Sequence, residues 1–197
     1  MISEATLGWN EVAATDSETV RLRRGDPEAL AAMVSRYQHR LYRYLLRLVR
    51  DPSTAEDLFQ QTWLRVVANL RRYDPEREFD AWLFAVAHNV AMDHLRRREP
   101  GSLVDQMAHG STDEAAAPHA YPDAFERVVA GERAARLETA LSELPAVYRE
   151  VLALRFEEEM KLEEIAGVCG APLSTVKSRL RRGLEALRRK LPAEAWR

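Results

Sequence analysis

Residues 162–191 constrain the fold of this chain more than any other stretch, and they read LEEIAGVCGAPLSTVKSRLRRGLEALRRKL. The pattern predicts a short apolar helix, a tight turn marked by Gly170 and Pro172, and a second helix. Ser174 or Thr175 stands where we expect the cap of that second helix. Its apolar residues recur at steps of four, four, three and four, which places them in one buried stripe. The stripe consists of Val176, Leu180, Leu184, Leu187 and Leu191.

The outer faces of the second helix are strongly basic, with seven cations against one acid, Glu185. A helix held by one apolar stripe, with hydroxyls and cations near its N-terminus, is typical of helices that read the DNA major groove. Cations neutralise phosphates, and Arg or Lys pairs with guanine edges. The alternative is a solvated basic face, but the preceding helix and turn favour DNA binding. The cations are Lys177, Arg179, Arg181, Arg182, Arg188, Arg189 and Lys190.

Charge is segregated along the chain. The 197 residues carry a formal net charge of −2, so any affinity for nucleic acid must come from local basic segments. Residues 99–132 hold seven carboxylates and a single cation, Arg127. The only cysteine, Cys169, excludes an internal disulfide and a cysteine-cluster metal site. Because the sequence contains neither a membrane-length apolar run nor a signal-peptide pattern, we expect a cytoplasmic protein without a membrane insertion. We also expect no metal and no cofactor.

The helical periodicity predicts an all-α fold of two helical domains joined by a flexible acidic linker. One helix begins at Asp26-Pro27, and the same start signal recurs at Asp51-Pro52. A third helix is expected over 79–98, followed by a segment rich in Gly, Ser, Ala, Pro and acids, the composition of a linker. The predicted organisation is an N-terminal arm over 1–19, a first domain over 20–98, a linker over 99–124 and a second domain over 125–195.

The two halves together resemble a bacterial extracytoplasmic function (ECF) sigma factor, the smallest class of RNA polymerase sigma subunits. The first half is similar to sigma region 2 through AEDLFQQTW at 55–63, FDAWL at 79–83, AHN at 87–89, Asp93 and RR at 96–97. The second half is similar to region 4 through LP at 144–145, RE at 149–150, LR at 154–155, EIA at 164–166 and STVKSRL at 174–180.

The resemblance implies a function without catalysis. A member of this family binds core RNA polymerase and directs promoter-specific initiation of transcription. Region 2 is then the domain that binds polymerase and recognises and melts the −10 element, and region 4 recognises the −35 element. The resemblance also implies an anti-sigma factor as a partner, which no residue of the chain identifies.

Three groups of polar residues are the predicted contacts, and solvation is the alternative for the first of them. Carboxylate and amide oxygens suit the arginine-bearing coiled coil of polymerase, and the predicted contacts are Asp57, Gln60 and Gln61. Promoter melting needs a polar pocket for an extruded base and cations along the strand, and the candidates are Asp80, Asn89, Asp93, Arg96 and Arg97. The candidates for the −35 element are Ser174, Thr175, Lys177, Ser178, Arg181 and Arg182.

Three positions depart from the family pattern, and a fourth, Trp82, has two interpretations. Lys161 stands where the family usually starts the first helix of the pair with Ser or Thr, so a side-chain acceptor is lost. His88 stands where Arg is common, which predicts a weaker or pH-dependent phosphate contact. Cys169 replaces a larger aliphatic residue and is interpreted as a small buried thiol. Trp82 has two interpretations, a stacking platform for a base or a member of the core.

Two other functions compete with this one. A stand-alone helix-turn-helix regulator predicts an upstream dimerisation, receiver or ligand domain, and the helices that carry Asp57 and Asn89 argue against it. An enzyme has little support, because His39, His88 and His94 have no partner at the spacing of a triad or a metal site. The sequence also has no phosphate-binding glycine loop.

Overall fold

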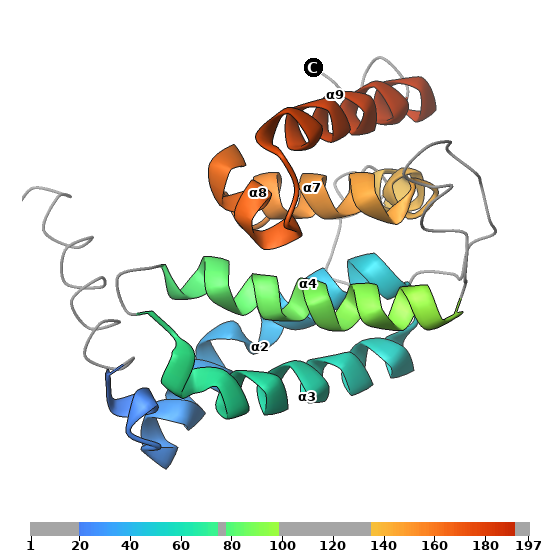
Figure 1. Cartoon of the computed structure of the whole chain (residues 1–197). Helices are drawn as coiled ribbons and strands as arrows, with labels where there is room; N and C mark the ends of the chain where they lie inside the picture. Colours follow the sequence, from blue (N-terminus) through green and yellow to red (C-terminus); the bar gives the residue numbers. More distant parts are fainter. Residues whose placement is uncertain (1–19, 75–77, 99–134, 192–197) are drawn as a thin grey trace, which may run out of the picture.

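The helices of the chain form two groups that follow each other in sequence. The computed structural model describes residues 20–74, 78–98 and 135–191, and within these ranges it contains helices and no strands (Figure 1). The predicted arm over 1–19 and linker over 99–124 lie outside the described residues. The first group is α2 (Pro27–Val49), α3 (Pro52–Asn69), the short 3-10 helix η1 (Leu70–Arg72) and α4 (Phe79–Arg98). The second group is α7 (Ala146–Phe156), α8 (Leu162–Cys169) and α9 (Leu173–Lys190).

The helix starts predicted at the two Asp-Pro pairs are confirmed. The Asp26 carboxylate accepts hydrogen bonds from the amides of Glu28 (2.9 Å) and Ala29 (3.4 Å) at the start of α2. Asp51 does the same for α3, accepting from the Thr54 amide at 2.8 Å. Each proline occupies the first helical turn, where its missing N–H leaves no hydrogen bond unmade.

Helices α2, α3 and α4 pack together around buried leucines and a cluster of aromatic rings. Trp82 belongs to this cluster, with its ring centroid 4.9 Å from that of Tyr73 and 5.7 Å from that of Phe79. The side chain is half-buried. In this structure Trp82 therefore packs against the core, which is one of the two interpretations of this residue.

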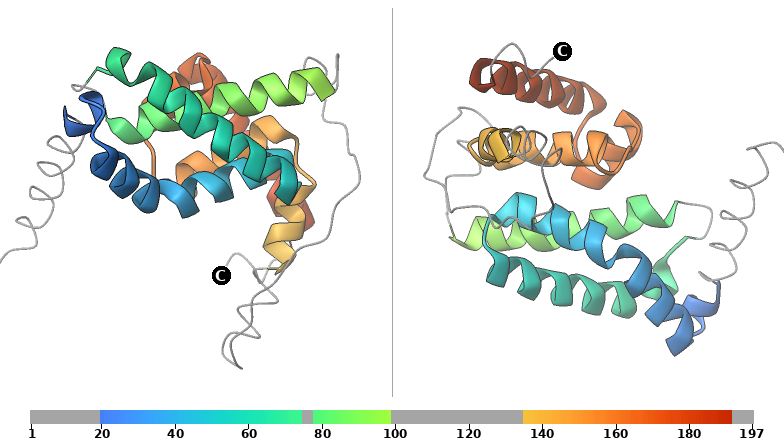
Figure 2. Two further views of the ribbon diagram at one scale, coloured as in Figure 1. Left: turned by 90° about the horizontal axis from the view of Figure 1, so that it is seen from below. Right: turned by 180° about the vertical axis from the view of Figure 1, so that it is seen from behind.

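The helices stack in four layers, and the two halves of the chain are in contact (Figures 1 and 2). Helix α3 forms one outer layer, α2 and α4 the next, α7 and α8 the third, and α9 the other outer layer. One hydrophobic cluster runs through the two middle layers, joining Tyr44 and Phe84 of the first half to Val151, Leu154 and Ile165 of the second. Within the described residues, no helix combines the length and apolar character that a bilayer crossing needs.

The turn between α8 and α9 has the predicted punctuation but not the predicted cap. Gly170 ends α8 in the left-handed conformation (φ 57°), which a residue without a Cβ adopts readily. Helix α9 begins one residue before Ser174, with Pro172 at the cap position and no side-chain hydrogen bond there. The prediction that Ser174 or Thr175 caps this helix is therefore wrong, because the rigid backbone of Pro172 already starts it and both hydroxyls fall inside the first turn.

Candidate nucleic-acid interface

Helix α9 presents its basic face on the outside of the molecule. Val176 and Leu187 are buried and anchor the helix. Gly183 lets α9 approach α7 closely, since a Cβ built there would lie 3.1 Å from Leu152 Cδ1. All six predicted contacts lie within the first ten residues of α9, about 15 Å of helix. Of these, Ser174, Lys177, Arg181 and Arg182 are exposed, while Thr175 and Ser178 are half-buried.

Hydrogen bonds and ion pairs distinguish the two ends of α9. The Ser178 hydroxyl donates to the Thr175 carbonyl at 2.9 Å, which orients it along the helix. Near the C-terminal end, Lys190 Nζ lies 2.5 Å from a Glu143 carboxylate oxygen. The only acid of α9, Glu185, lies 3.9 Å from Arg181. The N-terminal half of α9 therefore combines exposed cations with hydroxyls, the pairing that groove recognition uses.

Four of the five residues predicted for the −10 element lie together on the C-terminal half of α4. Asn89, Arg96 and Arg97 are exposed. Asp93 is half-buried and pairs with Arg65 (3.3 Å) and Arg96 (3.5 Å). Their spacing of three to four residues places them along neighbouring turns of one helix.

Asp80 does not join this group. It lies in the first turn of α4, nine residues before Asn89 or about 13 Å along the helix axis. The Tyr37 hydroxyl donates to one of its oxygens, and Arg40 Nη2 donates to the other at 2.8 Å. Burial and the Asp80 charge raise the pKa of Tyr37, so the phenol stays protonated as the donor. Both oxygens of the Asp80 carboxylate are therefore engaged within the protein.

The outer face of α3 carries the three residues predicted for polymerase docking, and all three are exposed. Two further side chains that the sequence analysis did not single out lie beside them: Leu64, 71% exposed, and Val67, 48% exposed. Both follow Gln60 and Gln61 at helical spacing. The signal was present in the sequence, because Leu64 falls outside the buried stripe of Leu58, Thr62 and Val66. The α3 docking face consists of Asp57, Gln60, Gln61, Leu64 and Val67.

Ion pairs line the contact between α2 of the first half and the region around α7 of the second. Arg40 Nε lies 2.7 Å from a Glu158 carboxylate oxygen. Arg47 Nε lies 2.9 Å from Glu157, and the same guanidinium also pairs with Glu138. Basic side chains of α2 thus face acidic side chains of the second half across this contact.

Arg149 of α7 is almost fully buried and reaches the C-terminal end of α2. Its guanidinium donates to the carbonyls of Arg47 (2.8 Å) and Leu48 (3.1 Å), two of the carbonyls that a helix end leaves without intrahelical partners. Burial, together with the nearby Arg50 and Arg47 charges, lowers the pKa of Arg149 to about 10, so it remains a cation at neutral pH. Arg149 therefore acts as a cap for α2 supplied from the other half of the chain.

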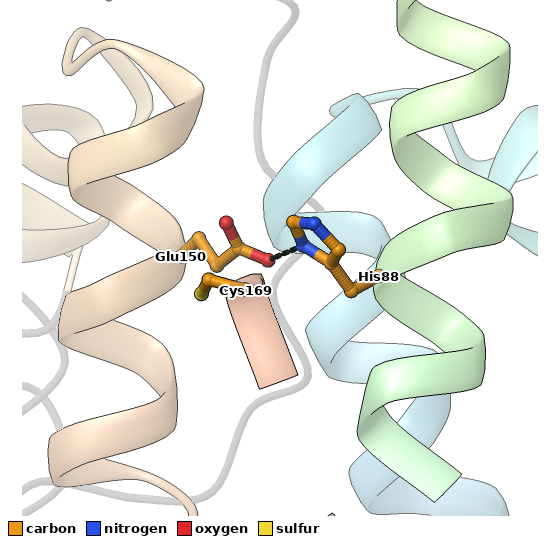
Figure 3. A group of neighbouring side chains, drawn as sticks. All are labelled: His88, Glu150 and Cys169. Carbon is orange, nitrogen blue, oxygen red and sulfur yellow. Dashed lines mark hydrogen bonds and ion pairs between the residues drawn. The ribbon is translucent and has the colours of Figure 1, made fainter. Parts of the chain in front are cut away.

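His88 points into the same contact and not outward. Its Nδ1 lies 2.5 Å from Glu150 Oε1 (Figure 3). The Tyr44 hydroxyl donates to that same oxygen at 2.7 Å. Cys169 of α8 completes the His–Glu–Cys cluster drawn in Figure 3. The His88 imidazole is therefore directed at a buried carboxylate of the protein in this structure, and its contact with a DNA phosphate stays a prediction.

Family models match both halves of the chain. The model described as Sigma-70 region 2 matches residues 33–100, and the model described as Sigma-70, region 4 matches residues 134–187. The first match spans most of α2 together with α3 and α4, and the second spans α7, α8 and most of α9. The contact lined by Arg40, Arg47 and Arg149 is therefore a contact between region 2 and region 4.

Relatives of similar length match nearly the whole chain. The ECF RNA polymerase sigma factor SigW of Bacillus subtilis is 30% identical, with 87% of this chain and 93% of that protein covered. The RNA polymerase sigma factor CarQ of Myxococcus xanthus is 32% identical, with 85% and 92% covered. Among solved structures, the sigma factor RpoE of Bartonella quintana, in complex with the anti-sigma factor NepR, shares the fold with a TM-score of 0.62 at 23% identity, covering 81% of this chain and 94% of that one.

Proposed function

This chain belongs to the ECF sigma factors of RNA polymerase, and from that premise we propose how its surfaces divide the work of initiation. As a sigma factor it binds core RNA polymerase and promoter DNA and directs transcription from chosen promoters. The observation that carries the proposed division is the placement of three polar surfaces on three different helices: α3, α4 and α9.

The α3 docking face binds the arginine-bearing coiled coil of core polymerase. Asp57 accepts hydrogen bonds from guanidinium groups, and the amide oxygens of Gln60 and Gln61 accept alongside it. Leu64 and Val67 add exposed apolar area beside these acceptors, which favours a protein partner over solvent.

The two nucleic-acid surfaces read separate promoter elements. On α4, Arg96 and Arg97 follow the backbone of the melted −10 strand while Asn89 and Asp93 contact bases. On α9, Lys177 and Arg181 contact base edges of the −35 element, with Arg182 on a phosphate and the hydroxyls of Ser174, Thr175 and Ser178 nearby. No catalytic step is required of this chain in either role.

An anti-sigma factor is the proposed regulator of this chain, and the cytoplasm its proposed location. The support for the regulator is likeness: the Bartonella quintana sigma factor with the same fold is in complex with an anti-sigma factor.

Binding to core polymerase tests the docking assignment. We expect Asp57→Arg to abolish binding, because the substitution places a cation against a basic partner, while the fold survives a change on an exposed face. Glu28→Arg is the matched control, since it makes the same charge change on an exposed residue of α2. Unchanged polymerase affinity of Asp57→Arg with a normal circular dichroism spectrum would overturn the docking assignment.

Footprinting and permanganate reactivity on one promoter test the division between the DNA surfaces. Lys177→Ala and Arg181→Ala should each weaken −35 recognition by about 1–3 kcal/mol. Both variants should still form the open complex on a promoter whose −10 strands are already separated. Asn89→Ala and Arg96→Ala should impair opening while the −35 footprint persists. Arg189→Ala, at the far end of α9, is the control. Equal loss of both signals in both groups of variants would contradict the proposed division.

A further inference from the structure

The His–Glu–Cys cluster joins three helices that belong to both regions of the protein. His88 comes from α4 of region 2, whereas Glu150 and Cys169 come from α7 and α8 of region 4 (Figure 3). One potential ligand atom from each side chain lies within 4.8 Å of the other two. The Glu150 side chain is 1% exposed and that of His88 is 14% exposed, so the cluster is shielded from solvent.

Glu150 is bonded unevenly. His88 and Tyr44 both contact Oε1, while Oε2 is buried and has no hydrogen-bond partner among the residues that the structure describes. A buried carboxylate oxygen without a partner is unfavourable, because it has lost its bonds to water and gained none. The arrangement therefore has an open acceptor position beside a thiol and an imidazole.

The three side chains match the ligands that Zn²⁺ prefers. Structural and catalytic zinc sites use Cys sulfur, His nitrogen and carboxylate oxygen, and a site with three protein ligands leaves the fourth position to water. Metal–ligand bonds of about 2.0–2.3 Å put neighbouring ligand atoms roughly 3.5 Å apart in a tetrahedron. An inward side-chain shift of about 1 Å brings the most widely separated atoms to that spacing. The mixture of imidazole and thiolate favours Zn²⁺ over Mg²⁺ or Ca²⁺.

We propose that His88, Glu150 and Cys169 bind one Zn²⁺ ion, which ties region 2 to region 4. The ion holds them as they lie in this structure, with α4 against α8 and α2 against α7, which is called the packed arrangement below. Binding of the ion replaces the contact between His88 and Glu150 and displaces the thiol proton of Cys169 to solvent, because the thiolate is the form that ligates a metal. Tyr44 keeps its hydrogen bond to Glu150 and orients the ligating carboxylate.

The cysteine makes the site detectable. Because the thiolate is the form of cysteine that ligates a metal, a thiolate-to-metal charge-transfer signal reports the bound ion.

The consequence for transcription rests on the proposed function. Zn²⁺ binds only when α4 is in contact with α7 and α8, so by linkage the ion favours the packed arrangement over any arrangement in which the regions are apart. Because the two promoter elements lie far apart on DNA, the ion should lower promoter-dependent transcription.

A Co²⁺ titration of the chelator-treated full chain tests the site directly. We expect a thiolate-to-cobalt charge-transfer band in the near ultraviolet that saturates at one ion per chain and is displaced by Zn²⁺. Cys169→Ala should abolish the band, and His88→Gln should weaken Zn²⁺ binding by more than roughly tenfold. His39→Gln, which removes an exposed imidazole from α2, is the matched control. No band with the wild-type protein, or an unchanged band with Cys169→Ala, would overturn the proposal.

Thermal melting and transcription separate the site from its effect. Zn²⁺ should raise the Tm of the wild-type chain and of His39→Gln but not that of Cys169→Ala, whose metal-free Tm and circular dichroism establish that it is folded. Transcription in a reconstituted assay should fall with Zn²⁺ for the wild type and for His39→Gln but not for Cys169→Ala. Metal binding without an effect on transcription would overturn the proposal that the ion holds region 2 against region 4. Normal transcription without metal binding would overturn the site and leave the sigma function intact.

Discussion

Asp51 determines where α3 begins and how that helix start responds to acid. Its carboxylate accepts from both the amide and the hydroxyl of Thr54, at 2.8 and 2.5 Å. These two hydrogen bonds hold the pKa of Asp51 below its ordinary value of 3.8. A carboxyl group with a lowered pKa contributes stability above its unfolded pKa, and the contribution is lost as the pH falls through the folded value.

We therefore expect Asp51→Asn to lower the Tm at neutral pH, because Asn caps the helix but carries no charge. The difference from the wild type should shrink as the pH falls below 3.8 and through the lowered pKa of the folded state, where Asp51 itself becomes neutral. Thermal melts of the full chain across this pH range measure it, with Asp57→Asn on the same helix as the control. A Tm difference that stays constant with pH would contradict the explanation.

Lys161 leaves a different helix start half capped. It occupies the cap position of α8, where the Glu164 carboxylate accepts from the Lys161 amide at 2.7 Å. The reciprocal bond is missing because an ammonium group cannot accept. Lys161→Ser should complete the capping box and stabilise the protein by about 0.5–1 kcal/mol. Chemical denaturation of the full chain measures the gain, and Lys161→Ala, which supplies no acceptor, should show none of it.

At the scale of elements, α3 uses its two faces for different purposes. Its inner face packs in the core through Leu58 and Val66, whereas Leu64 and Val67 face solvent. Exposed apolar side chains beside polar ones are typical of interface anchors, which cost more than 1 kcal/mol of binding energy when truncated.

Leu64→Ala should therefore weaken binding to core polymerase by roughly fivefold or more, while its unfolding free energy changes by less than about 0.5 kcal/mol. Titration of labelled protein with core polymerase measures the affinity. Leu137→Ala, which truncates another exposed leucine outside α3, is the control. Equal affinities for the two variants would remove Leu64 from the docking face.

Sequence patterns predicted the helices well where local chemistry decides them. The Asp-Pro starts of α2 and α3, the span 79–98 and the glycine at the end of α8 all depend on neighbouring residues. The start of α9 was mispredicted because a hydroxyl near a helix start resembles a cap even where a proline already starts the helix. The engagement of both Asp80 oxygens within the protein depends on Tyr37 and Arg40, which lie about forty residues earlier and left no local signal.

At the scale of the whole molecule, the packed arrangement is short compared with a promoter. The names of the −10 and −35 elements put them roughly 25 base pairs apart, or about 85 Å of B-DNA. Two layer spacings of 8–10 Å separate α4, which carries the residues proposed for the −10 element, from α9 by roughly 20 Å. Regions 2 and 4 therefore have to separate before both elements are engaged.

The ion pairs around Arg47 should control that separation. Arg47→Glu places like charges opposite Glu157 and Glu138, so the radius of gyration measured by small-angle X-ray scattering should increase. Combining Arg47→Glu with Glu157→Arg restores one opposite-charge pair and should bring the radius back towards the wild-type value. An increase in the double variant as large as in the single one would show that this pair does not hold the regions together.

The contact between the regions could not be predicted from the sequence. Arg149 and Glu150 are charged residues in an ordinary amphipathic helix, a pattern that usually indicates solvent exposure. They are buried only because their partners, Leu48 and Tyr44, approach from about a hundred residues earlier in the chain. The same holds for the proposed Zn²⁺ site, because His88, Glu150 and Cys169 come from three separate segments of the sequence.

The capping of α2 by Arg149 has a calorimetric consequence. Region 4 can unfold in the packed state only if α2 also loses the donor to its last carbonyls and the hydrophobic cluster is opened. Heat should therefore melt both regions in a single transition, with equal van 't Hoff and calorimetric enthalpies, although the chain is built from two family modules. Once the regions separate, each module melts at its own temperature, so the number of peaks in a calorimetric scan reports whether the sigma factor is packed or open.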